Sequence, residues 1–515
     1  MRLAKRSRAR LPRGEGAGAW LAAGSVALSL LALLALLSLL VIRGLGHFWP
    51  ASIALVALDD GRQLAGEQVR EVPLPDGTGR ERLYRIGNRD LDGTRWAWVP
   101  VSAIAAVSHP PELMVLERHR WGEAIGRLVA VESETGERLE GQAARAALEN
   151  RMTELASLRQ ARDTLRDEVV LPRVQALQEG VDVERQLATA NARLRELQAA
   201  MQAGHLTLET ASGERWQVPL DQILRVRYPN AMSPLDKLVV WGEGVWRFLS
   251  EGPRAANTAG GVWPAIFGTV LMVMLMSILV TPFGVLAAIY LNEVAHQGRL
   301  TRLVRIAVRN LAGVPSIVYG VFGLGVFVYG IGGSLDEWFF DAALPSPTFG
   351  TGGLLWASLT LALLTLPVVI VATEEGLARI PDQQREGALA LGATRLEMLT
   401  RVVLPMATPA MLTGVILAVA RAAGEVAPLM LVGVAKLAPQ VPVDGDFPFL
   451  HLERKFMHLG YHIFDAAFHG GDVQAAMPLV YATALLLVLV ILVLNLTAIF
   501  LRHHLSTRHG ALSRR

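Results

Sequence analysis

The sequence contains no cysteine, and it is poor in charged residues. Without cysteine, the chain has no disulfide, no thiolate metal ligand and no cysteine nucleophile. Charged residues are 18% of the 515 residues, whereas about a quarter is usual in soluble domains. Hydrophobic residues are 52%, and the mean hydropathy is +0.36. This composition indicates an integral membrane protein. The net charge of +3 gives no indication of a nucleic-acid partner.

Signatures of catalysis and cofactor binding are also missing. No glycine is followed by lysine, so the chain lacks a G-x-x-x-x-G-K-[ST] loop for ATP, and it lacks an H-E-x-x-H zinc motif. Four histidines occur in the segment 435–477, and we interpret them as loop residues rather than metal ligands. We therefore predict no catalytic residue, no metal site and no cofactor bound to this chain.

Six stretches are long and apolar enough to cross a membrane as helices, which takes about 20 residues. They cover residues 19–42, 263–291, 311–333, 353–372, 408–434 and 478–501. The first is longer than the apolar core of a signal peptide, and no small-x-small cleavage site follows it. We therefore interpret it as an uncleaved anchor.

Lysines and arginines concentrate on every second connection. They are frequent in 1–18, 292–309, 373–405 and the tail after 501, sparse in 435–477 and absent from 335–352. Because basic connections stay in the cytoplasm, this pattern predicts that both termini are cytoplasmic. It defines cytoplasmic tails at 1–18 and 506–515, and it places the long segment 43–258 on the outer side.

The outer segment reads as a small α/β domain. Strand-like runs with turn signals occupy 51–135 and 205–228, and heptad-like apolar spacing between them predicts a helical hairpin at about 137–203. Pro172 and Gly180 are expected to separate its two helices. The hairpin is either a solvated spacer or a docking arm for a partner. Residues 233–250 predict an amphipathic helix, either at the membrane interface or in the core of the outer domain.

The fifth apolar stretch carries two ionisable residues. Arg421 falls near its middle and Glu425 one turn later. Such groups are costly in a membrane and normally face a cavity or a partner charge. They can neutralise each other along one helix. Alternatively, Arg421 lies on a pathway for an anion, because a guanidinium donates two parallel hydrogen bonds to a phosphate.

Polar residues also flank a break at the start of the third stretch. Asn310 and Ser316 bracket Gly313 and Pro315, which disfavour a regular helix. Broken helices near a polar cavity often serve ions, so we include Asn310 and Ser316 among the candidate pathway residues. A simple kink is the alternative.

The segment 380–405, IPDQQREGALALGATRLEMLTRVVLP, lies between the fourth and fifth stretches. The order Glu386, Gly387, Ala388 and then Gly392 resembles the E-A-A-x-x-x-G loop of ABC-transporter permeases, whose short coupling helix fits a groove on an ATP-binding subunit. Gly387 departs from the usual alanine and loosens the helix by up to about 1 kcal/mol. An amphipathic helix lying on the membrane is the alternative.

Five further segments resemble phosphate-specific permeases of type I ABC importers. They are 260–269, 281–293, 310–325, 366–381 and 420–433. The resemblance covers about 255–505 and implies a bacterial inner-membrane protein. Its fold would be mainly α, with a type I importer permease core at 259–505, a coupling loop at 374–405 and the periplasmic insert 43–258. The resemblance assigns the contact with the ATPase to Glu386, Gly387, Ala388, Gly392, Ala393 and Glu397.

The resemblance also implies partners. A sister permease would complete the pathway, a dimer of cytoplasmic ATPase subunits would bind ATP, and a periplasmic phosphate-binding protein would deliver inorganic phosphate. The chain itself would do no covalent chemistry. The alternatives are an ABC permease for sulfate or molybdate, or a membrane-anchored sensor or scaffold whose outer domain binds a partner.

Overall fold

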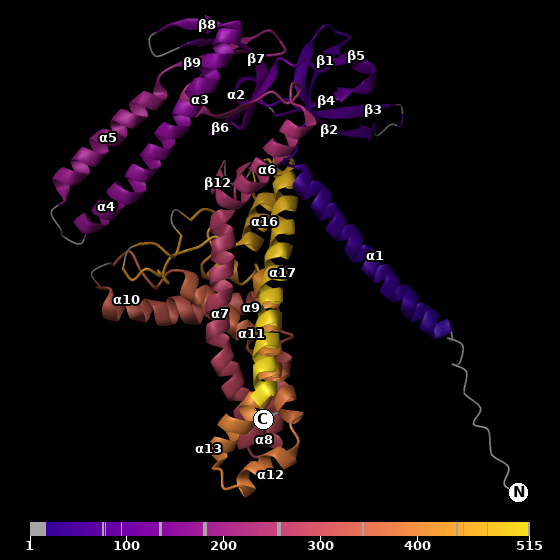
Figure 1. The fold of residues 1–515 in the computed structure, drawn as a ribbon, viewed down its shortest axis with the longest axis vertical. Coiled ribbons are helices and arrows are strands. Elements are labelled where there is room, and N and C mark those ends of the chain that lie inside the picture. The colour runs from indigo at the N-terminus through magenta and orange to yellow at the C-terminus, as the bar shows by residue number, and fades with distance from the viewer. Residues whose placement is uncertain are drawn as a thin grey trace, which may run out of the picture.

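The computed structural model describes residues 17–74, 77, 79–93, 95–132, 136–178, 183–254, 259–341, 344–438, 441–445, 447–470 and 472–512. A long helical bundle carries an α/β insert at one end (Figure 1). The predicted tail 1–18 lies almost wholly outside the described residues, as do the last three residues of the predicted tail 506–515.

Within this part of the chain, six helices are long and apolar enough to cross a membrane, which confirms the predicted polytopic, mainly helical fold. They are formed by α1 (Ala17–Gly46), α7 (Trp263–Ile289) with the π turn η5 (Tyr290–Val294), α9 (Ser316–Phe322) with η6 (Gly323–Gly332) and α10 (Gly333–Phe339), α11 (Leu354–Ala378), α13 (Arg395–Met398) with η8 (Leu399–Val403) and α14 (Leu404–Gly424), and α17 (Val473–Leu512).

Helix α11 forms the centre of the bundle, between α7 and α14. Its buried side chains join theirs in one apolar core. Glycines allow the close approach: a Cβ added at Gly284 of α7 would lie 2.6 Å from Cγ1 of Val369, and one added at Gly414 of α14 would lie 2.8 Å from the Cβ of Ala372. Packing of this bundle therefore depends on small residues at the helix contacts.

Helix α1 points away from the bundle and contacts it near the C-terminal end of α1 (Figure 1). A Cβ added at Gly44 would lie 3.0 Å from the Cα of Ala482 in α17, and the indole of Trp241 donates a 2.9 Å hydrogen bond to the carbonyl of Leu45. The apolar side chains earlier in α1 are exposed. Lipid or another apolar surface must cover them.

Two predicted spans have different bounds because prolines end the helices before them. A proline ring clashes with the carbonyl four residues earlier. Accordingly, the amphipathic helix α8 (Arg299–Leu311) ends four residues before Pro315, and the third span begins at Ser316 rather than 311. In the same way α14 ends at Gly424, four residues before Pro428, so the fifth span does not reach 434.

Two short helices follow that break, α15 (Leu429–Val432) and α16 (Leu459–Phe468). His458 and His462, which the sequence interpretation placed among loop residues, are buried at the start of α16 and within it. The predicted coupling loop 374–405 is also shorter than expected, because α11 continues to Ala378 and α14 begins at Leu404.

The insert contains two antiparallel sheets. The first has the strand order β4-β3-β2-β1-β5, and the second has the order β10-β9-β7-β6-β11, with β8 paired to β7. The strands of the first sheet are β1 (Ile53–Leu58), β2 (Gln63–Pro73), β3 (Arg80–Arg85), β4 (Trp96–Pro100) and β5 (Ile104–Ser108), with helix α2 (Arg89–Asp92) before β4. Those of the second are β6 (Leu113–Arg118), β7 (Glu123–Glu132), β8 (Arg138–Glu140), β9 (His205–Glu209), β10 (Arg215–Pro219) and β11 (Ile223–Arg227).

The predicted hairpin is present, but Pro172 does not separate its helices. The first arm runs through α3 (Gly141–Thr164), the π turn η2 (Leu165–Val170) and α4 (Leu171–Gln178), and the second is α5 (Glu184–Gln202). Pro172 is the second residue of α4, just after the wider π turn, and the guanidinium of Arg173 donates to the carbonyl of Val169 at 3.0 Å. Gly180 lies outside the described residues. Figure 1 shows both arms extending from the second sheet.

Helix α6 (Pro234–Ser250) connects the insert to α7 through β12 (Pro253–Arg254) and β13 (Ala259–Gly260). It begins with a capping box in which Ser233 and Asp236 exchange hydrogen bonds. Leu235 and Trp246 are exposed and Phe248 is buried, so the helix has an uncovered apolar face. The predicted interfacial position of this helix stays a prediction.

Candidate functional site

The predicted coupling residues lie at the end of the bundle opposite the insert (Figure 1). Here α12 (Asp382–Ala390) and α13 form the connection between α11 and α14. Pro381 precedes α12, and Asp382 occupies its first turn, where a negative charge favours the helix N-terminus.

Gly392 makes the turn between the two short helices. Its φ is +88°, a left-handed conformation that disfavours every residue with a side chain. The amide of Gly392 donates to the carbonyl of Leu389 at 3.0 Å, and that of Ala393 donates to Ala388 at 3.1 Å. Gly392 is therefore required by the backbone as well as by the predicted contact.

Glu397 has a local role that the sequence interpretation missed. Its carboxylate accepts hydrogen bonds from the amide and the hydroxyl of Thr394, at 3.0 and 2.9 Å, and its own amide donates to that hydroxyl at 3.2 Å. This capping box fixes the start of α13. The T-x-x-E pattern could have been recognised in the sequence.

The two helices present a mixed surface to solvent. Glu386 and Gly387 are exposed, and a Cβ at Gly387 would meet nothing within 4 Å. Leu391 is 91% exposed and Leu396 is 70% exposed. We call the exposed residues Glu386, Gly387, Leu389, Leu391 and Leu396 the coupling surface. Ala388 and Ala393 are half-buried beneath it.

Arg385 anchors α12 to the ends of two membrane helices. Its guanidinium donates to the carboxylate of Glu293 in η5 at 2.9 Å, and to the carbonyls of Leu377 and Ile380 at the end of α11 at 2.9 and 2.6 Å. A further bond of 3.1 Å reaches Asp382. Four acceptors thus surround a side chain that is only 16% exposed.

Arg305 of α8 makes a second anchor beside the first. It donates to Glu374 at 2.9 Å, to Gln297 at 2.9 Å and to the carbonyl of Leu291 at 2.8 Å. Arg305 and Arg385 line a cleft of about 730 Å³ between α8, α11 and α12. The sequence interpretation missed both anchors. One signal was available: Glu293 is the only acidic residue among the four arginines of 292–309.

Arg421 lies in the last turn of α14, at the break in the bundle. Its Nε is 3.5 Å from Oε1 of Glu425, which lies in extended backbone beyond the helix. The pair is therefore not the intrahelical pair that the sequence suggested, because the helix ends between the two residues. Their side chains are 31% and 20% exposed, so neither is fully buried by the described part of the chain.

Arg421 lies near the other predicted break, but the described contacts of its side chain do not include Asn310 or Ser316, the polar residues there. A Cβ added at Gly320 of α9 would lie 2.6 Å from the Cα of Pro428, so the two breaks adjoin. At the first break, the hydroxyl of Tyr319 donates a 2.7 Å hydrogen bond to the carbonyl of Leu311. Ser316 begins α9 and is half-buried, whereas Asn310 is exposed near the end of α8. Among the described residues, no hydrogen bond or ion pair joins Arg421 to either of them.

Comparison with known proteins places this arrangement in a class. Residues 280–509 match the family of binding-protein-dependent transport system inner membrane components. The phosphate transport system permease protein PstA 1 of Mycobacterium tuberculosis is 33% identical over 50% of this chain and 76% of its own length. PstA of Yersinia pestis is 34% identical over 49% of this chain and 75% of its own length.

A solved structure of the MetNI methionine ABC transporter aligns with 48% of this chain and 94% of that chain at 16% identity. Its TM-score of 0.32 is too low to add weight. The sequence matches and the helical fold define the chain as an inner-membrane permease of the ABC importer class. Within that class, it belongs to the family of PstA-type phosphate transport permeases.

Proposed function

We propose that this chain is the transmembrane permease subunit of an ATP-driven importer of inorganic phosphate. The observation that carries the proposal is the match to PstA proteins over about three quarters of their length. The family match at residues 280–509 includes the coupling loop and both broken helices. These relatives carry phosphate transport in their names. The resemblance of the coupling loop to the E-A-A-x-x-x-G pattern supports ATPase contact.

The proposed assembly has four kinds of subunit. A sister permease, PstC, would form the pathway with this chain. A cytoplasmic PstB dimer would bind and hydrolyse ATP, so this chain would carry out no catalysis. The phosphate-binding protein PstS would dock on the outer side, where the distribution of positive charge leads us to expect the insert as well.

The anchored arginines suggest how a movement of the ATPase would reach the pathway. The coupling surface would contact PstB, and displacement of α12 would be transmitted through Arg385 to the ends of α7 and α11. Because α11 is packed against both α7 and α14, its movement would also shift α14 and Arg421. Arg421 would then meet phosphate at the broken end of α14.

Reconstitution tests this proposal directly. The full chain should copurify with an ATPase and a second permease, and the complex in proteoliposomes should hydrolyse ATP in response to the phosphate-loaded binding protein. Uptake of radiolabelled phosphate should be unaffected by excess sulfate or molybdate. Inhibition of phosphate uptake by sulfate or molybdate would indicate that the importer carries a different oxyanion. Failure to assemble with an ATPase would contradict the permease role.

A further inference from the structure

A second group of arginines lies far from the coupling loop, where the insert joins the membrane helices. Its members come from both sheets, from α6 and from β12. We call this group the junction cluster. It contains Arg85, Arg225, Arg227, Arg247 and Arg254 together with Glu67, Glu117, Glu123 and Glu251. The cluster has one guanidinium more than it has carboxylates. It lies outside the residues that match the permease family.

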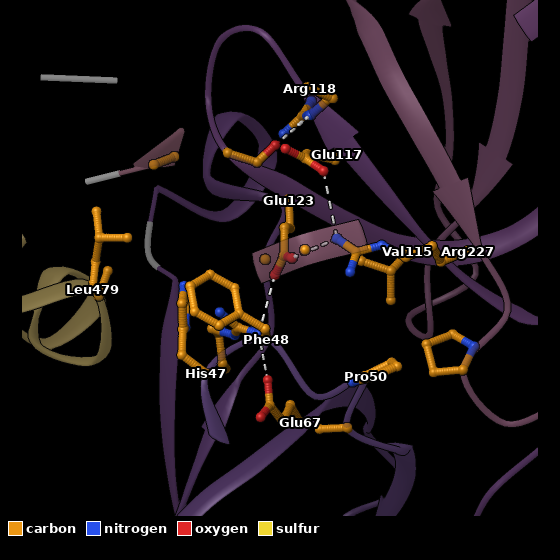
Figure 2. A pocket seen from close by; sticks show the side chains of 18 of the residues that line it. His47, Phe48, Pro50, Glu67, Val115, Glu117, Arg118, Glu123, Arg227 and Leu479 are labelled. Atoms are coloured by element: carbon orange, nitrogen blue, oxygen red, sulfur yellow. Dashed lines mark hydrogen bonds and ion pairs between the residues drawn. The ribbon is translucent and has the colours of Figure 1, made fainter. Parts of the chain in front are cut away.

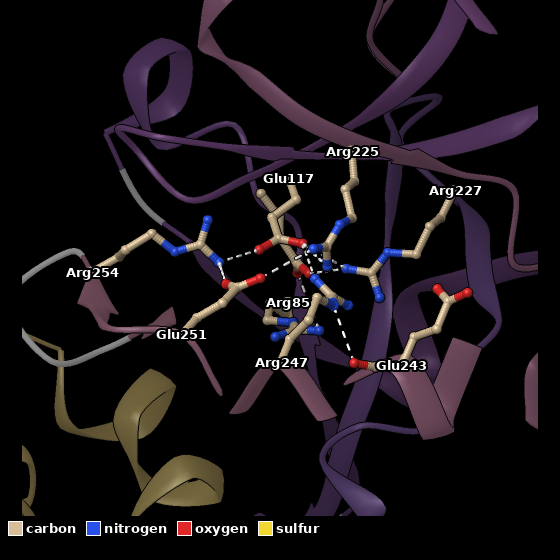
Figure 3. A network of polar contacts seen from close by, with 9 residues as sticks. Arg85, Glu117, Arg225, Arg227, Glu243, Arg247, Glu251 and Arg254 are labelled. Carbon is tan, nitrogen blue, oxygen red and sulfur yellow. Dashed lines mark hydrogen bonds and ion pairs between the residues drawn. The ribbon is translucent and has the colours of Figure 1, made fainter. Parts of the chain in front are cut away.

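Glu117 is the centre of the cluster, and four guanidiniums surround it (Figure 3). Only Arg254 makes a short contact, at 2.9 Å. Arg227 and Arg247 are each 3.5 Å away, and Arg225 is 3.8 Å away. Three of the four contacts are therefore longer than a well-formed hydrogen bond, so these three guanidiniums are held mainly by charge.

Several donors of the cluster have no acceptor. The Nε atoms of Arg227 and Arg254 and one terminal nitrogen of Arg225 are buried, and no hydrogen-bond acceptor among the described residues reaches them. Buried donors are normally satisfied, because an unpaired donor has lost its hydrogen bonds to water without replacing them. An additional acceptor is the simplest means of satisfying them.

The cluster also borders a cavity of about 210 Å³. Figure 2 shows Glu123 and Arg227 facing this space, with His47 and Phe48 on another side of it. Four arginines of the cluster line the cavity: Arg85, Arg227, Arg247 and Arg254. A liquid water occupies about 30 Å³, so the space admits an ion of five heavy atoms with waters around it.

The carboxylates of the cluster line the same cavity, and the neighbouring arginines keep Glu123 charged. Burial acts to raise the pKa of Glu123, yet the charges of Arg85 and Arg227 hold that pKa below its ordinary value. Burial lowers the pKa of Arg225 although Glu117 and Glu251 act in the opposite direction. Glu123 is thus ionised, and the cluster holds five guanidiniums against four carboxylates.

We propose that the junction cluster binds a small tetrahedral oxyanion of the phosphate or sulfate type between the insert and the membrane helices. Such an ion offers four oxygens, which match the planar donor pairs of several guanidiniums at once. The two sheets, α6 and β12 would then be held together by a shared anion in addition to Glu117. The proposal does not depend on which solute the permease imports.

Anion binding by the full chain in lipid nanodiscs tests the proposal. Isothermal titration with inorganic phosphate, and separately with sulfate, should show binding by the unmodified chain. Arg227→Gln should weaken it roughly tenfold or more, because a charge-assisted contact is lost. Arg80→Gln is the matched control: it removes the same charge from an exposed position of the insert, and binding should not change.

A variant that removes a negative charge, instead of a positive one, separates anion binding from a purely structural role. Glu117→Gln keeps the shape of the side chain and removes the competing carboxylate, so the affinity for the oxyanion should rise. A network that only held the fold together would lose stability in this variant without gaining affinity. Absence of binding by the unmodified chain, unchanged binding by Arg227→Gln, or loss of binding only in Arg421→Gln would each overturn the proposal.

Discussion

The two ends of this protein use arginine in opposite ways. At the coupling end, the guanidinium of Arg385 donates to four acceptors, two of which are backbone carbonyls at the end of α11. In the junction cluster, several guanidiniums share the carboxylate of Glu117, and buried donors remain without an acceptor among the described residues. Positive charge is buried in both places, but the guanidinium of Arg385, unlike those of Arg225, Arg227 and Arg254, has described acceptors for its buried donors.

This difference has a physical meaning. A guanidinium with all its partners in the same chain fixes the relative position of the elements that supply them, so it is suited to transmit a displacement. A guanidinium with unfilled donors favours whatever ion can fill them. Under our two proposals, the coupling end would transmit a displacement, and the insert junction would respond to an anion.

Removing the saturated arginine should have the largest effect. Arg385→Gln leaves the carboxylate of Glu293, which is 9% exposed, without its partner. Breaking one side of a buried pair costs about 3–5 kcal/mol. We expect ATP hydrolysis in proteoliposomes to lose its dependence on the binding protein, and phosphate uptake to fall more than tenfold.

Two variants control this experiment. Arg379→Gln removes the same charge from an exposed position in the same connection and should leave uptake unchanged. Adding Glu293→Gln to Arg385→Gln removes the uncompensated carboxylate and should restore part of the stability, as a double-mutant cycle would measure. Equal activity of Arg385→Gln and the unmodified chain would show that α12 is not connected to α7 and α11 in this way.

The sequence predicted the membrane helices because an apolar stretch of about 20 residues has few other outcomes in a bilayer. It predicted two short helices between the fourth and fifth spans through a local pattern, and their contact with an ATPase stays a prediction. Both helix breaks were also readable, since each helix ends four residues before Pro315 or Pro428. The extent of α14 was missed because hydropathy continues across the break, and Arg421 was accordingly placed in the middle of a helix.

The anchors and the junction cluster could not be read in this way. Arg385 and Glu293 are 92 residues apart, and Arg254 and Glu117 are 137 residues apart. Sequence periodicity reports which face of an element is apolar, whereas these contacts depend on how distant elements meet. In the sequence, such contacts are indicated only by an isolated charge next to an apolar stretch, such as Glu293 before the arginines of 292–309.

Arg421 is intermediate between Arg385 and the arginines of the junction cluster. Its only ion-pair partner among the described residues is Glu425, at 3.5 Å. If it meets the transported anion, Arg421→Gln should lower phosphate uptake roughly tenfold, which corresponds to about 1.4 kcal/mol. Arg421→Lys should retain less than full uptake, because an ammonium lacks the planar donor pair. Normal uptake by both variants in correctly assembled complexes would remove Arg421 from the pathway and leave it with a structural role.

Substitutions in the turn between α12 and α13 should have the smallest effect, and they are the most closely controlled. Gly392→Ala forces an L-residue into left-handed backbone at a cost of about 1–2 kcal/mol, whereas Gly392→Asn should be milder because asparagine tolerates that conformation. Gly387→Ala has open space for its methyl group and should stabilise α12 by up to about 1 kcal/mol. Affinity for the ATPase, measured by copurification at graded detergent and salt, should therefore fall in the order Gly387→Ala, unmodified chain, Gly392→Asn, Gly392→Ala. Equal affinity across this series would mean that the shape of the turn does not matter for the contact, and the coupling surface would then act through its exposed side chains alone.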